Sequence, residues 1–249
     1  MVRLRVYLTG ELCMNAGGVL VRGDRLPRRQ GRLAFAYLVS ERSRPVSRDE
    51  LADLLWPQRL PTAHEVALSA LISKLRTLLV EVGLMRQALA TASGGFRLEL
   101  PPDAWVDTEA ALEAVHEAEA ALRVGSTNDA YGPAVVASTI LRRPFLPGAE
   151  GAWVDERREA LRAARLRALD CLAEVHAWNS EPSLALRAAD EAVGLEPFRE
   201  VGYRHLMRIH QHAGNRAEAI RVYERLRRLL AEELGARPAP ETEAVLEEV

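Results

Sequence analysis

The sequence predicts an α+β winged helix over residues 1–102, followed by an all-α, tetratricopeptide-like helical repeat domain over residues 103–249. Three observations lead to this fold class. In the first hundred residues, strand patterns come first and last with helix patterns between them. A 34-residue repeat occurs in the helical remainder, and the two parts differ in charge. Residues 1–102 hold 15 Arg or Lys against 9 Asp or Glu, whereas residues 103–249 hold 18 against 26. A basic part joined to an acidic part is typical of a nucleic-acid-binding module joined to a regulatory one.

Strand patterns open and close the N-terminal domain. Apolar and polar side chains alternate over residues 2–8, which is the period of a half-buried strand. An apolar run at residues 19–21 follows the Asn-Ala-Gly-Gly of residues 15–18, whose glycines permit a tight hairpin. A second hairpin is predicted over residues 90–100, around the Ser-Gly-Gly of residues 93–95.

Three helices are expected between these strands. The first begins at Arg29 and stops before Pro45, whose ring cannot continue a helix. The second is short and ends at Pro57. It begins at Ser47, where a capping box with Glu50 satisfies two amide groups of the first turn.

The third helix, residues 62–82, carries the candidate binding face. It is expected to begin at a second capping box, Thr62 to Glu65, and to end at Gly83. Its apolar side chains form one stripe that must be buried: Leu68, Leu71, Ile72, Leu75, Leu78, Leu79 and Val82.

The opposite face of this helix lacks bulky polar and acidic side chains. It carries Val66, Ser69, Ala70, Ser73 and Thr77, flanked by Lys74, which is the only lysine of the chain, and by Arg76. Small hydrogen-bonding groups rimmed by cations suit a helix that lies in a phosphate-lined groove. The alternative is a solvated face that happens to lack acidic residues.

The motifs of this domain resemble those of a known family. The segments RDELADLLWP, SALISKLRTLL and ATASGGFRLEL resemble the OmpR-like winged helix at the start of the SARP family, the antibiotic regulatory activators of actinobacteria. Members commonly show Leu-Trp-Pro, Ser-Arg-Leu-Arg and Gly-Tyr-Arg-Leu, which correspond here to residues 55–57, 73–76 and 95–98. Lys74 replaces the usual arginine and Phe96 the usual tyrosine. Because lysine cannot form a bidentate fork, a phosphate contact is favoured over a guanine contact at this position.

The C-terminal domain contains an internal repeat. Aligning Ala185 with Ala219 gives a shift of 34 residues, which is the period of the tetratricopeptide repeat. Residues 214–243 closely resemble the end of the bacterial transcriptional activator domain that follows the winged helix in the same family. Further helices of the same stack are expected at residues 107–122, 127–141 and 152–177.

The resemblance implies a sequence-specific DNA-binding transcriptional activator. Such a protein binds direct repeats in double-stranded promoter DNA near the −35 region and recruits the RNA polymerase holoenzyme through its principal sigma factor. Self-association on the DNA is possible, and the controlled genes are expected to serve secondary-metabolite (antibiotic) biosynthesis. Because the chain ends soon after the last helix, the ATPase and sensor regions of larger relatives are expected to be absent.

Each candidate residue has an expected role and an alternative. Ser69, Ser73 and Thr77 would approach base edges, and Val66 or Ala70 would meet a thymine methyl group. The residues expected to hold phosphates are Lys74, Arg76 and, from the wing, Arg97. The alternative for Arg76 is an ion pair with an acidic residue of the helical domain, and the serines could be no more than small surface residues.

Other classes of function find less support in the sequence. It contains no phosphate-binding loop, dinucleotide fingerprint, nucleophile elbow or HExxH motif, so no enzyme and no cofactor are expected. His210 and His212 lie two positions apart on a helix and point in different directions, which favours packing over a metal site. Cys13 and Cys171 are expected to be free thiols. A protein-binding scaffold that never touches DNA is the alternative reading, but it leaves the basic domain without a role.

The location expected from these patterns is cytoplasmic and nucleoid-associated, with no membrane partner. The N-terminus alternates apolar and polar residues and does not resemble a signal peptide. The longest uncharged run in the second half, residues 130–141, is twelve residues long, which is too short to span a bilayer.

Overall fold

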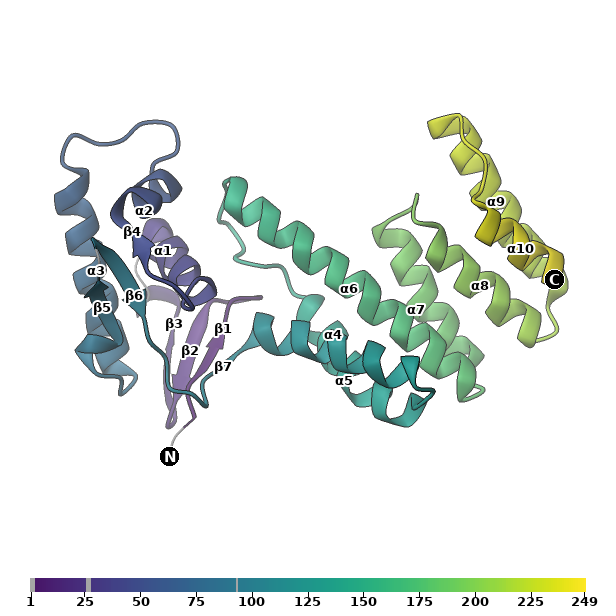
Figure 1. Ribbon diagram of the computed structural model, residues 1–249, viewed down its shortest axis with the longest axis horizontal. Coiled ribbons are helices and arrows are strands. Elements are labelled where there is room, and N and C mark those ends of the chain that lie inside the picture. The colour runs from purple at the N-terminus through teal and green to yellow at the C-terminus, as the bar shows by residue number, and fades with distance from the viewer. Residues whose placement is uncertain (1–2, 26–27, 93) are drawn as a thin grey trace. The chain divides into compact units, whose positions relative to one another are not determined.

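The computed structural model describes residues 3–25, 28–92 and 94–249 (Figure 1). Val2 of the predicted first strand and Ser93 of the predicted wing turn lie outside the described residues. The chain forms two compact units, Met1–Ala110 with Arg143–Leu161, and Ala111–Arg142 with Arg162–Val249. Helices α4 (Asp107–Arg123) and α6 (Ala152–Trp178) contribute residues to both units. The domain division after residue 102 remains a prediction, and the compact units follow a different division.

Unit 1 begins with a four-stranded sheet of order β3-β2-β1-β7. Its strands are β1 (Arg5–Tyr7), β2 (Cys13–Ala16), β3 (Val19–Arg22) and β7 (Trp105–Val106). The predicted hairpin is confirmed, since Ala16 pairs with Val19 across Gly17 and Gly18, whose φ angles are 61° and 84°. Two positive φ values suit a two-residue turn that matches strand twist. Strand β7 and the first arm of this hairpin, β2, were not predicted as separate strands, because both are short and lack a clear alternation.

Three helices and a second sheet complete the winged helix. The helices are α1 (Arg29–Ser40), α2 (Arg48–Leu55) and α3 (His64–Glu81). The second sheet has the order β4-β6-β5 and contains β4 (Val46–Ser47), β5 (Leu89–Ala92) and β6 (Gly95–Leu98). Two short 3-10 turns, η1 (Gly23–Arg25) and η2 (Arg86–Ala88), precede α1 and β5. The predicted helix order and the predicted wing hairpin are therefore confirmed, and β4 is an addition.

One predicted capping box is correct and the other is wrong. The Ser47 Oγ accepts a hydrogen bond from the Glu50 amide at 3.0 Å, as predicted at the start of α2. Helix α3 instead begins at His64, and its N-cap is Ala63, whose methyl group cannot accept a hydrogen bond. A backbone turn occupies this place, because the His64 amide donates to the Pro61 carbonyl at 3.0 Å. Thr62 thus lies one residue too early to act as the cap.

The end of α3 follows the prediction. Gly83 has a φ of 83°, a left-handed conformation that favours glycine. The amide of Leu84 donates to the Leu79 carbonyl at 2.9 Å, and the amide of Gly83 donates to the Val80 carbonyl at 2.9 Å. These two bonds form a Schellman motif, which satisfies carbonyls at the helix end.

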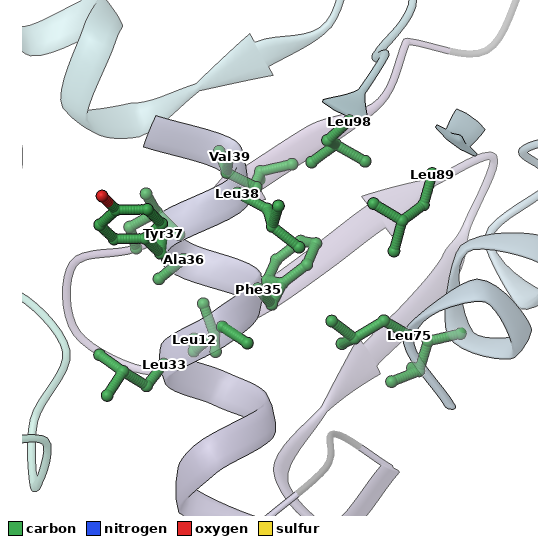
Figure 2. Packing of buried hydrophobic residues seen from close by; sticks show 14 of the residues in the cluster. Leu12, Leu33, Phe35, Ala36, Tyr37, Leu38, Val39, Leu75, Leu89 and Leu98 are labelled. Carbon is green, nitrogen blue, oxygen red and sulfur yellow. The ribbon is translucent and has the colours of Figure 1, made fainter. Parts of the chain in front are cut away.

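Helix α1 is covered on both sides within unit 1. Every residue from 33 to 39 is buried. Figure 2 shows Phe35 and Leu38 pointing toward Leu75 of α3 and Leu89 of β5, whereas the Tyr37 side chain projects from the opposite side of α1. The Tyr37 ring meets the Trp153 ring edge-on at a centroid distance of 5.0 Å. Residues 143–161 belong to unit 1 because they cover this second side.

A buried carboxylate joins β1 to the start of α4. The side chain of Asp107 is fully buried and accepts hydrogen bonds from the amides of Leu8 (2.8 Å) and Thr9 (2.9 Å). It also accepts from the Thr9 hydroxyl at 2.7 Å and from the Thr108 amide at 2.8 Å. Four donors compensate for the lost hydration of the charge, which would otherwise be costly to bury.

Unit 2 consists of helices packed through small residues. Besides parts of α4 and α6 it contains α5 (Thr127–Leu141), α7 (Pro182–Leu195), α8 (Glu200–His212), α9 (Arg216–Leu234) and α10 (Pro240–Glu248). Ala185 of α7 and Ala219 of α9, which the predicted repeat aligns, are both fully buried. Gly202 of α8 permits a close helix approach, since a Cβ there would lie 2.9 Å from Cγ2 of Val193. Gly214, with φ of 73°, forms the predicted turn between α8 and α9.

Within the described residues, no helix combines the length and the apolar character that crossing a membrane requires.

Replacing Asp107 with asparagine should lower the free energy of unfolding by about 3 kcal/mol, because an amide NH₂ group would then face a backbone donor in a buried site. Chemical denaturation of the full chain measures this loss. Asp103→Asn is the matched control, since that side chain is exposed and its carbonyl, which accepts from Arg3, is unchanged. An equal loss in both variants would contradict the assigned role.

Stability should also depend on the ionisation of Glu50. Hydrogen bonds from Arg44 and Tyr37 outweigh partial burial and lower the pKa of Glu50 to about 2. Because this pKa lies below that of an ordinary glutamate, the ionised group contributes stability above about pH 4.5 and loses it as the pH falls toward 2. Urea denaturation between pH 6 and pH 2.5 should therefore show a smaller pH dependence for Glu50→Gln than for the wild type.

Asp53→Asn, an exposed change on the same helix, is the control for this pH series. If Glu50→Gln kept the acid-side slope of the wild type while Asp53→Asn removed it, the stabilising ionisation would belong elsewhere.

Candidate nucleic-acid interface

One face of α3 is exposed along most of its length. Val66 is 70% exposed, and Ser69, Ala70, Ser73, Lys74 and Thr77 are exposed beside it. The predicted apolar stripe lies on the other side, where Leu68, Ile72 and Leu75 are at most 1% exposed. The helix is thus fixed through its leucine side, and the small residues remain available for contact with a partner.

The hydroxyl groups of this face differ in what they can donate. The Thr77 hydroxyl donates to the Ser73 carbonyl at 3.1 Å, so its proton is already used within the helix. In the described parts of the chain, the hydroxyls of Ser69 and Ser73 have no hydrogen-bond partner. These two serines can therefore both donate to and accept from a base edge, whereas Thr77 keeps acceptor capacity only.

The acidic residues of α3 stand at its two ends and are paired. Glu65 lies 3.0 Å from the Arg48 guanidinium, and Glu81 lies 2.8 Å from that of Arg25. No acidic residue occurs between them. Lys74 is exposed and has no ion-pair partner among the described residues. The face therefore carries positive charge without a compensating carboxylate, which suits a polyanionic partner.

Arg76 contacts the wing. Its Nε donates to the Leu89 carbonyl at 2.9 Å, and its Nη2 donates to the Thr91 hydroxyl at 3.0 Å. Both partners belong to β5, so Arg76 fixes the wing to the side of α3. The predicted phosphate contact of Arg76 remains a prediction. The role as a brace was not predicted, because no local pattern reveals a partner thirteen residues away.

The wing places Arg97 on its outer surface. Arg97 is exposed between the buried side chains of Phe96 and Leu98, and its Nε lies 3.7 Å from Glu99. Gly95 starts β6 where the backbone of β4 comes very close, since a Cβ at this position would lie 2.1 Å from the Val46 carbonyl oxygen. The glycine of the Gly-Phe-Arg-Leu motif is therefore required by packing of the wing.

Sequence reasoning missed a group of cations beside this face. Arg28 and Arg29 stand at the start of α1 and, together with Lys74, line a hollow next to α3. They precede the periodic part of the helix, so the apolar pattern that located α1 gave no sign of their proximity to α3.

The environments of the two cysteines and of the close histidine pair offer little for thiolate or metal chemistry among the described residues. Burial raises the pKa of the Cys171 thiol to about 12 and also raises that of Cys13, which disfavours the nucleophilic thiolate. No group of three or more metal-binding side chains was found across residues 3–25, 28–92 and 94–249. The Nδ1 of His212 lies 2.7 Å from the Arg208 carbonyl, whereas the Nδ1 of His210 is buried.

Comparisons with known proteins agree on one family. The model of the bacterial transcriptional activator domain matches residues 106–249. The chain is 28% identical over 254 residues to the transcriptional regulatory protein EmbR of Mycobacterium tuberculosis, covering 99% of this chain and 63% of that protein. It is 28% identical over 211 residues to the regulatory protein AfsR of Streptomyces coelicolor, covering 85% of this chain and 21% of that protein.

A further relative and a solved structure extend this similarity. The transcriptional regulatory protein MoaR1 of M. tuberculosis is 26% identical over 253 residues, covering 99% of this chain and 81% of that protein. The structure of M. tuberculosis EmbR in complex with a low affinity phosphopeptide matches all of this chain with a TM-score of 0.91 and 26% identity. This chain covers 65% of that structure, so it spans only part of EmbR and a fifth of AfsR.

EmbR and MoaR1 are transcriptional regulatory proteins, AfsR is a regulatory protein, and the activator-domain model covers more than half of the chain. With its winged helix followed by this domain, the chain belongs to the SARP family of bacterial transcriptional regulators.

Proposed function

We propose that the protein is a sequence-specific DNA-binding transcriptional activator, which reads promoter direct repeats with α3 and recruits RNA polymerase. The observation that carries this proposal is the exposed face of α3, which lacks acidic residues between the paired Glu65 and Glu81. A scaffold that binds only proteins has no need for such a face. The relatives EmbR and MoaR1, which are transcriptional regulatory proteins, support the same conclusion.

Base recognition falls to the short side chains of α3. Ser69 and Ser73 have hydroxyls free to donate or accept, so they suit base edges in the major groove. Thr77 offers an acceptor, and the apolar groups of Val66 and Ala70 suit the methyl group of thymine.

Phosphate contacts hold the helix in register. Lys74 supplies a point charge, which suits a phosphate oxygen, and Arg97 supplies a second charge from the wing. Arg76 has two of its donors on β5, so in this proposal its main task is to position the wing against α3.

The partners follow from the family. Promoter DNA binds to residues 1–102, and the RNA polymerase holoenzyme, including its principal sigma factor, contacts the protein on the bound promoter. Copies of the chain associate on adjacent repeats, and the protein acts in the cytoplasm, at the nucleoid. The controlled genes serve secondary-metabolite (antibiotic) biosynthesis. The function requires no cofactor and no catalysis.

The decisive test is binding of the full chain to its own upstream region and to those of neighbouring genes, titrated with salt beside a scrambled duplex. Tight, salt-dependent binding to one of these regions supports the proposal. Binding no tighter than to the scrambled duplex, even at low salt, would favour the scaffold reading.

Lys74→Ala should weaken binding about equally for all DNA sequences. It should also reduce the slope of log K against log salt by about one, because one phosphate contact is lost. Fluorescence anisotropy across a salt series measures both effects. Lys74→Arg is the matched control and should keep the slope of the wild type; unchanged low-salt affinity in Lys74→Ala would show that Lys74 does not contact the duplex.

Ser73→Ala should change sequence preference while the salt slope stays constant. The loss at a preferred base pair is expected to be about 1 kcal/mol, since one hydroxyl contact to a base edge is removed. Competition binding with operators that carry single base-pair changes measures it. A uniform loss across all operators would assign Ser73 to the DNA backbone instead.

A further inference from the structure

A basic hollow lies between the start of α1 and one side of α3, entirely within unit 1. Its volume is about 870 Å³, and it is open to solvent. The side chains that matter for its chemistry are Arg25 from η1, Arg28 and Arg29 from the start of α1, and Ala70, Lys74 and Thr77 from α3. We call it the basic hollow.

The positive charge of the basic hollow exceeds its negative charge. Its carboxylate, Glu81, is held by Arg25 at 2.8 Å. Neither Arg28 nor Lys74 has a side-chain partner in the part of the chain that the structure describes. Arg29 lies 2.9 Å from Glu150, but the side chains of this pair are 62% and 81% exposed, so the ion pair is weak and easily exchanged. Three cations are thus available to an anion.

The basic hollow adjoins the candidate recognition face. Ala70, Lys74 and Thr77 belong to both surfaces. The major groove is about 12 Å wide and a helix with its side chains is about 10 Å wide, so side chains on the flanks of an inserted helix meet the phosphates that border the groove. The basic hollow lies at this flank, and its cations carry the charge that suits such a phosphate.

The wing lies on the opposite flank of α3. At 100° per residue, Lys74 and Arg76 project from the helix in nearly opposite directions. Arg76 binds β5, so the wing flanks one side of the recognition face and the basic hollow flanks the other. The start of α1 adds to the attraction, because its first turn contains no acidic residue and carries the positive end of the helix dipole.

We infer that the basic hollow binds a phosphodiester group of the duplex, on the strand that borders the groove opposite the wing. Arg28 and Lys74 are the phosphate ligands, and Arg29 joins them by leaving Glu150. This inference rests on the proposed function and extends it, because it places a second backbone contact on α1, which holds no predicted base-reading residue. The DNA backbone is then contacted on both flanks of α3, by the wing on one and by the basic hollow on the other.

The test compares the full-length wild type with Arg28→Gln, with Arg28→Gln/Arg29→Gln and with Arg5→Gln. Arg5 is exposed on β1, outside the basic hollow, so its variant controls for the change in net charge. The slope of log K against log salt should fall by about one for Arg28→Gln and by up to about two for the double variant, and it should not change for Arg5→Gln. Near-ultraviolet circular dichroism and thermal unfolding verify that each variant is folded.

Ethylation interference locates the contact on the DNA. In the wild type, ethylation of the phosphates that the protein contacts should block DNA binding. For Arg28→Gln, ethylation of one or two of these phosphates should no longer matter, whereas ethylation of the phosphates that face the wing should still block binding. Salt slopes for the arginine variants equal to that of Arg5→Gln, with unchanged interference, would overturn the inference and leave the proposed function intact. A wild-type protein that binds no duplex specifically would overturn the proposed function itself.

Discussion

The fold of the N-terminal unit depends on one buried charge. Asp107 lies at the first turn of α4, and its carboxylate accepts hydrogen bonds from the amides of Leu8 and Thr9 at the end of β1. Nearly a hundred residues separate these partners, and the winged helix lies between them in the sequence. The first helix of the activator domain therefore begins inside the core of the N-terminal unit. A carboxylate in such a place stabilises only the chain path that brings all its donors together, because any other path leaves a buried charge unpaired.

Two layers of packing in the same unit lie on opposite sides of α1, and one of them supports α3. On one side of α1, Phe35 and Leu38 pack toward α3. On the opposite side of α1, Tyr37 contacts Trp153. Arg158 fixes the segment that carries this second layer, since it donates to the carbonyls of Phe145, Leu146 and Ala149. The orientation of α3 is thus linked to residues that follow the winged helix in the sequence by more than forty positions.

Local patterns predicted the elements well and their long-range partners poorly. The stripe from Leu68 to Val82 identified α3, because burial of one helix side leaves a periodic signal. The Thr62 capping box failed because α3 begins one residue later than the box requires, after a backbone turn from Pro61 to His64. Asp107 and the brace formed by Arg76 depend on partners distant in the sequence, and Arg28 precedes a periodic segment, so no local pattern indicated these roles. The exposed residues of the candidate face, by contrast, were all predicted, since exposure on a helix follows from its buried side.

The solitary lysine has a chemical consequence. Since Lys74 is the only lysine and is exposed on α3, amine-directed chemistry finds one side-chain target in the chain, at the edge of the candidate face. Acetylation there removes a positive charge at this face without touching any other side chain. Reductive methylation with a labelled methyl group keeps that charge and places the only side-chain reporter on the same residue, beside the one on the N-terminal α-amino group. The arginine-rich composition thereby makes one surface of the molecule selectively addressable by amine-directed reagents.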